Sequence, residues 1–256
     1  MRLDVFLSEN GFADSRTEAK GFITEGAVTV NGKSITKPAF DVLGDEHIEV
    51  QRDIKKYVSR GGLKLEGALL EFDVNVNGKM AIDVGASSGG FTDCLLKNGA
   101  ESVIAVDSGS GQLVESLRRD SRVISIENFN ARYMTPDSLP FAPNLAVMDV
   151  SFISATYIIK PLSDCLSDGA DFICLIKPQF EVGRVAIGKG GIVKSEAERK
   201  RAIEKVTLFA ESVGFRHIKT IRSPIEGGDG NIEYLAHFKK EAVLEKSYYN
   251  SERNEG

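Results

Sequence analysis

The chain has 256 residues, of which 42% are hydrophobic and 27% charged, the composition of a globular protein that can bury one or two cores. No stretch approaches the roughly 18 apolar residues that span a bilayer, and Asp4 and Glu9 interrupt the start where a signal peptide would be apolar. The net charge of −5 does not by itself indicate a nucleic-acid binder, and three separated cysteines with three scattered histidines indicate neither disulfides nor a metal site. The cysteine pattern favours a reducing, cytoplasmic setting.

Residues 1–50 predict a small α+β unit. The stretches "RLDVFLSEN" and "DSRTEAKGFITEG" have the apolar spacing of two short helices, the second with Asp14 or Ser15 as N-cap and Glu18 completing a capping box. A strand, an Asn-Gly turn and a second strand follow in "AVTVNGKSIT", and "HIEV" predicts a third strand. The polar stretch 51–60 is expected to link this unit to the rest of the chain.

From residue 61 onward, strands and helices alternate, which predicts an α/β fold with a mostly parallel sheet and helices on both faces. Helices are expected at 63–72, 90–98, 111–119, 155–167 and 195–213. The seven expected strands are 79–84, 102–107, 122–126, 144–149, 171–176, 215–222 and 231–238. Residues 61–240 would form this second domain, and 241–256 a charged tail.

A glycine-rich turn in "AIDVGASSGGFTDCLL" follows the first of these strands and enters a helix. Its glycines permit a sharp turn and a ligand lying against the backbone, and the helix N-terminus offers free N–H groups. The spacing differs from that of dinucleotide sites and of the P-loop, which argues against a triphosphate. A carboxylate at Asp83 suits a positively charged ligand such as an ammonium or a sulfonium, although a purely structural turn is the alternative. The predicted cofactor residues here are Asp83, Gly85, Ala86, Ser87, Ser88, Gly89, Gly90 and Phe91.

Polar residues also follow the next two strands. Asp107 ends the strand at 102–107, where a carboxylate can accept hydrogen bonds from two ribose hydroxyls. Glu127 and Asn128 follow the strand at 122–126, where they would contact the edge of a nucleobase; Asn128 also suits a simple turn.

Four charged residues lie near other element ends: Asp149 and Lys177 after two apolar strands, Glu233 in a later strand, and Lys64 in the helix before the first strand. Because the carboxyl ends of parallel strands converge, Asp149 and Lys177 should meet beside the glycine-rich turn. Each residue taken alone also suits a surface charge, and Lys177 could simply be the first solvated residue after "FICLI". Together they predict a mutually neutralising cluster, in which a lysine beside another cation favours its neutral form and can act as a base.

Six motifs then resemble one family: "SRGGLKLEGAL", "DVGASSGGFTDCLL", "VIAVDSGSGQL", "MDVSFIS", "LIKPQFE" and "GNIEYLAHF" are similar to the TlyA family of ribosomal RNA 2′-O-methyltransferases. That family joins an S-four-type RNA-binding domain, which residues 2–38 resemble, to an FtsJ-like methyltransferase. The resemblance covers almost the whole chain and implies a Rossmann-like class I methyltransferase sheet. Matched motif by motif, it implies that Lys64, Asp149, Lys177 and Glu233 form a catalytic Lys-Asp-Lys-Glu tetrad.

The resemblance implies methyl transfer from S-adenosylmethionine, without a metal, to the 2′-hydroxyl of a ribose in ribosomal RNA or a ribosomal subunit. Lys177 would take or share the hydroxyl proton, Asp149 and Glu233 would orient the lysines, and Asp149 would also lie near the cofactor's methionine part. The short form of the family, which this chain resembles, implies a cytidine in large-subunit RNA. Ser110 departs from the bulkier residue that the family carries between these glycines.

RNA binding is expected from basic side chains in the first 60 residues, which contain nine Lys or Arg and ten Asp or Glu. The basic side chains gather in 51–60. An ordinary solvated surface of mixed charge is equally compatible with this distribution. The predicted RNA-binding residues are Arg2, Arg16, Lys20, Lys33, Arg52, Lys55, Lys56 and Arg60.

Three other functions compete with this one. A membrane-active, haemolysin-like protein, a label the family has carried, would need an export signal or a long cationic amphipathic stretch, and the sequence shows neither. A non-catalytic RNA-binding adaptor would not need the complete tetrad together with Asp83 and Asp107. A methyltransferase for small molecules or proteins would not need the N-terminal RNA-binding unit. The sequence specifies neither the oligomeric state nor the residues that would turn out the target base.

Overall fold

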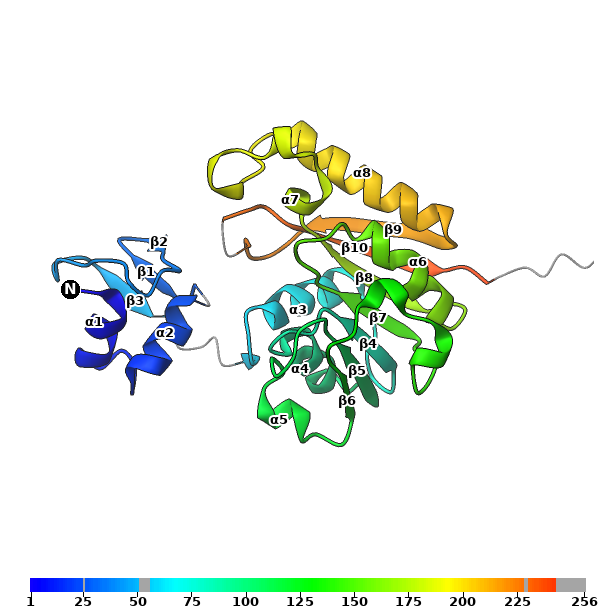
Figure 1. The fold of residues 1–256 in the computed structure, drawn as a ribbon, viewed down its shortest axis with the longest axis horizontal. Coiled ribbons are helices and arrows are strands. Elements are labelled where there is room, and N and C mark those ends of the chain that lie inside the picture. The colour runs from blue at the N-terminus through cyan, green and yellow to red at the C-terminus, as the bar shows by residue number, and fades with distance from the viewer. Residues whose placement is uncertain (25, 51–55, 228–229, 243–256) are drawn as a thin grey trace, which may run out of the picture.

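The computed structural model describes residues 1–24, 26–50, 56–227 and 230–242. An N-terminal α+β unit precedes a larger α/β unit (Figure 1). The N-terminal unit packs two helices against a small antiparallel sheet of order β2-β1-β3. Its elements are α1 (Leu3–Glu9), α2 (Arg16–Thr24), β1 (Val28–Val30), β2 (Lys33–Ser34) and β3 (Ile48–Val50).

The second helix begins with the predicted capping box. The N–H of Glu18 donates to Ser15 Oγ at 3.1 Å, and the N–H of Asp14 donates to Glu18 Oε2 at 2.8 Å. Leu3, Leu7 and other apolar side chains of both helices are buried against the sheet in a core of their own.

One carboxylate is buried in this small unit. Asp4 is 0% exposed, and its two oxygens receive the half-exposed guanidinium groups of Arg2 and Arg16, each at 2.9 Å. The hydrogen bonds from Arg2 are the largest cause that lowers the pKa of Asp4 to about 2. Two of the arginines expected to contact RNA are therefore also part of the local structure.

Replacing Asp4 with Asn should destabilise the protein by about 1–3 kcal/mol near neutral pH, because both guanidinium groups lose a charged partner. The folded pKa lies below the unfolded value, so this contribution is present above about pH 4 and disappears as the pH falls through about 2. Thermal unfolding followed by circular dichroism should show that the difference in melting temperature between wild type and variant narrows from pH 6 to pH 2. A gap independent of pH would contradict this account.

The larger unit contains a seven-stranded sheet of order β6-β5-β4-β7-β8-β10-β9, which confirms the predicted fold class. The five strands from β6 to β8 are parallel, and β10 runs antiparallel to both β8 and β9. The strands are β4 (Met80–Val84), β5 (Ser102–Val106), β6 (Val123–Ile126), β7 (Leu145–Met148), β8 (Asp171–Ile176), β9 (Phe215–Arg222) and β10 (Tyr234–Lys240).

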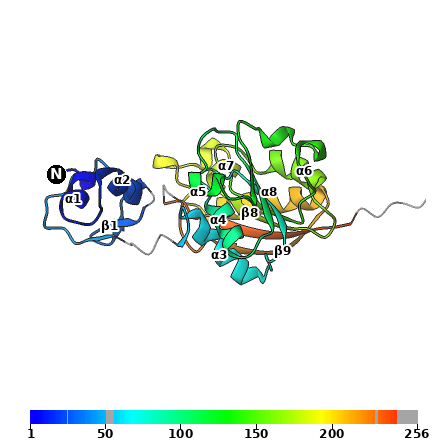
Figure 2. The ribbon, with the colours of Figure 1, turned by 90° about the horizontal axis from the view of Figure 1, so that it is seen from below.

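Helices cover both faces of this sheet, with α3 and α6 on opposite sides (Figures 1 and 2). Side chains alternate along β4, so that Ile82 and Val84 enter the core beneath α6 and α8 while Ala81 enters the core beneath α3 and α4. The α-helices are α3 (Gly61–Phe72), α4 (Gly90–Lys97), α5 (Glu115–Arg118), α6 (Thr156–Cys165), α7 (Pro178–Glu181) and α8 (Glu196–Ser212).

Two element boundaries differ from expectation by three residues or more. The helix expected at 111–119 is shortened to α5, because Gly111 has a φ of +65° and Val114 is still extended. The last strand begins at Tyr234 rather than 231, because its partner strand β8 ends at Ile176, opposite Tyr234. Glu233 therefore lies just before the strand.

Candidate functional site

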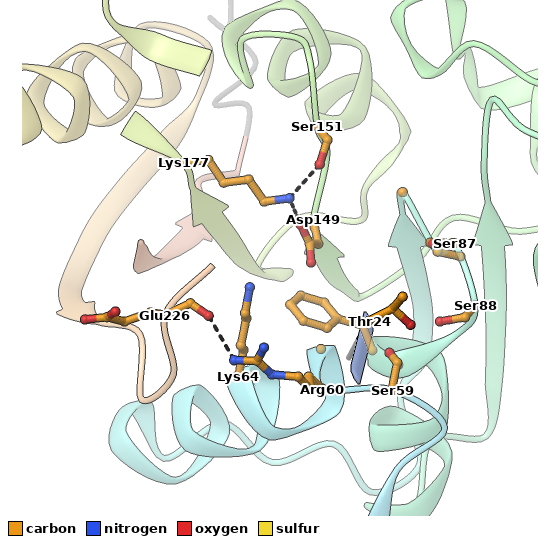
Figure 3. A pocket seen from close by; sticks show the side chains of 15 residues that line it. Thr24, Ser59, Arg60, Lys64, Ser87, Ser88, Asp149, Ser151, Lys177 and Glu226 are labelled. Carbon is orange, nitrogen blue, oxygen red and sulfur yellow. Dashed lines mark hydrogen bonds and ion pairs between the residues drawn. The ribbon is translucent and has the colours of Figure 1, made fainter. Parts of the chain in front are cut away.

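Two adjoining cavities open at the carboxyl edge of the parallel strands. The first, here called the lysine cavity, has a volume of about 330 Å³ and is lined by Lys64, Lys177 and Asp149 together with the glycine-rich turn (Figure 3). The second, the Asp107 cavity, has a volume of about 480 Å³ and lies over the ends of β4 and β5. The residues that line both cavities are Gly85, Ser87, Asp149 and Ser151.

The predicted tetrad is assembled as two ion pairs. Lys64 Nζ lies 2.5 Å from Glu233 Oε2, and these side chains are 10% and 3% exposed. Lys177 Nζ lies 2.6 Å from Asp149 Oδ1 and donates a hydrogen bond to Ser151 Oγ at 2.7 Å. The Asp149 contact is a close ion pair without hydrogen-bond alignment, since Asp149 Oδ1 accepts no hydrogen bond within the described part of the chain.

Local structure explains how these side chains converge. Lys177 follows the fully buried strand β8, and Pro178 then starts α7, so the lysine emerges at the sheet edge. Asp149 leaves β7 beside it, and Lys64 comes from the first turn of α3 (Figure 3). Glu233 does not line the cavity and acts on it through Lys64.

The glycine-rich turn brings the end of β4 close to the end of β7. Gly85 has a φ of +87°, and a Cβ atom there would lie 2.3 Å from the carbonyl oxygen of Asp149. Only glycine permits this approach. Asp149 is thereby held in the wall that the two cavities share.

Asp107 lies in the wall of the second cavity with its carboxylate held by the backbone. Its oxygens accept hydrogen bonds from the N–H groups of Ser87 at 2.8 Å and Gly109 at 2.7 Å. Apolar side chains of Val84, Phe129 and Ile158 line the same cavity. A carboxylate with free lone pairs beside an apolar floor suits a nucleoside.

The structure places neither Glu127 nor Asn128 in the cavity wall. The carboxylate of Glu127 accepts the N–H of Gly111 at 2.9 Å and pairs with Arg118 at 2.8 Å, contacts that lower its pKa. Asn128 has a φ of +55° and lies in a turn, which was the alternative prediction for this residue. The neighbouring side chains that line the cavity are those of Phe129, Asn130, Ala131 and Arg132. Ser110, the residue that departs from the family pattern, is exposed and does not line this cavity.

Asp83 is fully buried beneath the glycine-rich turn and lines neither cavity. It accepts a hydrogen bond from Thr92 Oγ1 at 2.6 Å, while its Oδ1 has no partner among the described residues. Burial is the main cause that raises its pKa to about 7. In the structure Asp83 contacts α4 beneath the turn, whereas the sequence predicted a contact with a positively charged ligand.

Replacing Asp83 with Asn should stabilise the protein at pH 8 relative to wild type, by up to a few kcal/mol. The pKa of Asp83 in the folded state lies above its value in the unfolded state. The stability that the protonated carboxyl contributes is therefore fully present below about pH 4 and is lost as the pH rises through about 7, whereas the amide of the variant does not titrate. Melting temperatures from pH 4 to pH 8 should show a growing advantage for the variant. A constant difference across that range would contradict a buried, titrating carboxyl.

The predicted RNA-binding residues fall into three groups. Lys20 and Lys33 are exposed, whereas Lys56 pairs with Glu66. Arg60 lines the lysine cavity and donates to the carbonyl oxygen of Glu226 at 3.2 Å (Figure 3). Arg2 and Arg16 hold Asp4, as described above, and Arg52 and Lys55 lie outside the described residues.

The end of the predicted linker is packed against the larger unit. Tyr57 is 4% exposed and packs in the core beneath α3 and α4, and the N–H of Val58 donates to Asp93 Oδ2 at 2.9 Å. Residues 56–60 thus reach the site as an ordered segment, which carries Ser59 and Arg60 to the lysine cavity.

Sequence reasoning missed two residues that follow Asp149. Ser151 holds the ammonium group of Lys177, and Phe152 is 92% exposed with a φ of +64°. Phe152 packs against Phe180 with ring centroids 5.2 Å apart. A large apolar side chain between two serines in "VSFIS", directly after a buried strand, was the available signal.

The FtsJ-like methyltransferase family model matches residues 57–240, and an S4 domain model matches residues 1–48. The chain belongs to the FtsJ-like methyltransferase family. This confirms the resemblance inferred from the motifs. None of the helices in the described ranges is long and apolar enough to cross a membrane, and those ranges hold no group of three side chains suited to a metal ion.

Several named relatives are similar over nearly the whole chain. Hemolysin A of Brachyspira hyodysenteriae is 44% identical over 239 residues, which cover 93% of this chain and 99% of that protein. The 16S/23S rRNA (cytidine-2′-O)-methyltransferase TlyA of Mycobacterium tuberculosis is 42% identical over 91% of this chain and 88% of its own. The 23S rRNA (cytidine-2′-O)-methyltransferase TlyA of Campylobacter jejuni is 32% identical over 94% and 100%. A putative hemolysin from Streptococcus thermophilus, a solved structure, has a TM-score of 0.75 and 43% identity over 94% of this chain and 88% of that one.

Proposed function

We propose that this protein transfers a methyl group from S-adenosylmethionine to the 2′-hydroxyl of a ribose in ribosomal RNA, at a cytidine and with the large subunit favoured. The observation that carries the proposal is the lysine cavity, in which two paired lysines face a wall shared with a nucleoside-sized cavity. The printed names of the relatives from Mycobacterium tuberculosis and Campylobacter jejuni support this reaction, and the second name supports the large subunit.

The residues of the Asp107 cavity fit S-adenosylmethionine. Asp107 would accept hydrogen bonds from the two ribose hydroxyls, and the apolar side chains of Val84, Phe129 and Ile158 would surround the adenine. The backbone at Gly85, where no side chain intervenes, would lie along the methionine part. The cofactor supplies a methyl group already activated by its sulfonium.

The lysine cavity would hold the acceptor ribose. A ribose hydroxyl is a poor nucleophile while protonated, so a base must take or share its proton as the oxygen approaches the methyl carbon. Lys177 lies at the wall shared with the cofactor cavity, and Asp149 and Ser151 fix its ammonium group. Lys64, held by Glu233, places a second lysine side chain in the same cavity.

Replacing Lys177 with Ala should lower the single-turnover methylation rate by about 10²- to 10⁴-fold, the usual contribution of a general base. Cofactor affinity, measured by calorimetry, should stay within a few-fold because Asp107 and the glycine-rich turn remain. Lys160→Ala, which removes an exposed lysine of α6 paired with Asp164, is the matched control and should leave the rate unchanged. A Lys177→Ala enzyme with a near wild-type rate would exclude the base role.

The N-terminal unit would hold the RNA. Its S4 domain match supports this assignment, as does Thr24 at the end of α2, which lines the lysine cavity. Arg60 in the same cavity wall would continue the positively charged path toward the acceptor. Phosphate contacts of this kind position an RNA without specifying its sequence.

Replacing Lys20 and Lys33 together with Gln should weaken RNA binding and reduce the slope of log affinity against log salt by about 1.4, or about 0.7 per lost phosphate contact. Both lysines are exposed and have no carboxylate partner among the described residues. Arg216→Gln on β9 removes a comparably exposed charge from the other unit and should leave the slope unchanged. An equal slope in the double variant and wild type would remove these lysines from the RNA path.

A membrane-active function is suggested by the name of the Brachyspira hyodysenteriae relative. No observation on the described residues favours it over methyl transfer. The paired tetrad also argues against a non-catalytic adaptor. An adaptor does not require two lysines held at the edge of a cofactor-sized cavity.

A further inference from the structure

A third hollow, here called the Tyr157 groove, lies beyond the loop that follows β7 and has a volume of about 1020 Å³. Its wall combines aromatic and basic side chains from four segments distant in sequence. The residues used below are Arg132, Phe152, Tyr157, Phe180, Arg184 and Lys205.

The aromatic side chains in this groove are unusually open to solvent. Tyr157 is 56% exposed and Phe152 is 92% exposed. The guanidinium carbon of Arg132 lies 4.7 Å from the centre of the Tyr157 ring, over its face, in a cation–π contact. Exposed aromatic rings beside arginine planes are the surfaces on which unpaired nucleobases stack.

The groove also carries unneutralised positive charge. Arg132 and Arg184 have no carboxylate partner among the described residues. The one buried carboxylate in the wall, Glu181, is already engaged by Lys205 at 2.9 Å and by the N–H of Ala155 at 2.7 Å. Two arginines without acidic partners suit the phosphates of a nucleic acid and disfavour a cationic or purely apolar partner.

The groove is continuous with the site of methyl transfer. Ser151 lines the lysine cavity, and the next residue, Phe152, lines both the Asp107 cavity and the Tyr157 groove. Consecutive Cα atoms are about 3.8 Å apart, so a nucleotide adjacent to the acceptor ribose is within reach of the groove. Tyr157 itself lines neither of the two cavities.

We propose that the Tyr157 groove binds a nucleobase of the unpaired RNA segment that flanks the methylated nucleotide, with Tyr157 and Arg132 as the stacking surface and Arg184 as a phosphate contact. This inference rests on the proposed function and names a part of the substrate that neither cavity holds. The groove would stabilise the local opening that exposes the target ribose, because a base stacked on protein no longer pairs within the RNA.

The test compares Tyr157→Ala and Tyr157→Phe in methylation of ribosomal subunits that lack this modification. Loss of one stacked base should raise KM about tenfold, with kcat and cofactor affinity unchanged, and the phenylalanine variant should stay within about twofold of wild type because it keeps the ring. Tyr133→Ala removes a tyrosine that is 73% exposed and lies outside the groove, and should have no effect. Arg184→Gln should raise KM and lower its salt dependence, whereas Arg216→Gln should not.

An unchanged KM in Tyr157→Ala, or a fall in kcat alone, would overturn the inference while leaving methyl transfer intact. Absence of methylation by the wild-type enzyme would instead overturn the proposed function. Ultraviolet crosslinking of a ten-residue oligouridine to the full chain gives a readout independent of activity. Adducts on peptides that contain Phe152, Tyr157 or Phe180 support the proposal. Adducts confined to other peptides contradict it, and that is also the result expected if the groove binds a protein partner instead of RNA.

Discussion

The site depends on how two lysines are kept at the nearly buried edge of a sheet. An ammonium group in such a place is costly unless a carboxylate compensates it. The chain supplies one carboxylate for each lysine from a different element: Asp149 after β7 for Lys177, and Glu233 before β10 for Lys64. The fold must therefore bring together segments up to 169 residues apart in sequence. The order of the strands and the geometry of the two ion pairs are for this reason a single constraint.

That constraint also explains the division between the cavities. Gly85 lets the end of β4 approach the carbonyl of Asp149, so both residues lie in the wall that the lysine cavity and the Asp107 cavity share. Under the proposed function, an acceptor oxygen in the lysine cavity would meet the methyl group at this wall. The nearby Phe152 lines both the Asp107 cavity and the Tyr157 groove. Asp149, Ser151 and Phe152 in the loop after β7 thus line all three hollows, which under the proposed function would hold the cofactor, the acceptor and the flanking RNA.

Much of this fold could be predicted from sequence because its strands are short apolar runs bounded by polar residues. The buried strand β8 has the bounds expected from "DFICLI", and the capping box of α2 forms as Ser15 and Glu18 indicate. Boundaries set by partners were less accessible. The start of β10 depends on where β8 ends, which is a property of the pairing and not of the residues around Glu233.

The positions of candidate site residues were predictable where they follow directly from strand ends, as for Asp107, Asp149 and Lys177, which all line a cavity wall. The direction of a side chain was not predictable where several partners lie within its reach. Asp83 turns into the layer of α4 to meet Thr92, and Glu127 is held by Arg118 and the N–H of Gly111. Side-chain direction at these positions depends on tertiary neighbours that the local pattern does not encode.

The most direct test is transfer of tritiated methyl from S-adenosylmethionine to ribosomal subunits prepared from cells that lack this protein. The account predicts label in large-subunit RNA at one cytidine whose 3′ linkage becomes resistant to alkali, and loss of that label with Lys177→Ala. Absence of label in either subunit, by an enzyme shown to bind the cofactor, would contradict the account. Label on a base or on a ribosomal protein would contradict it equally.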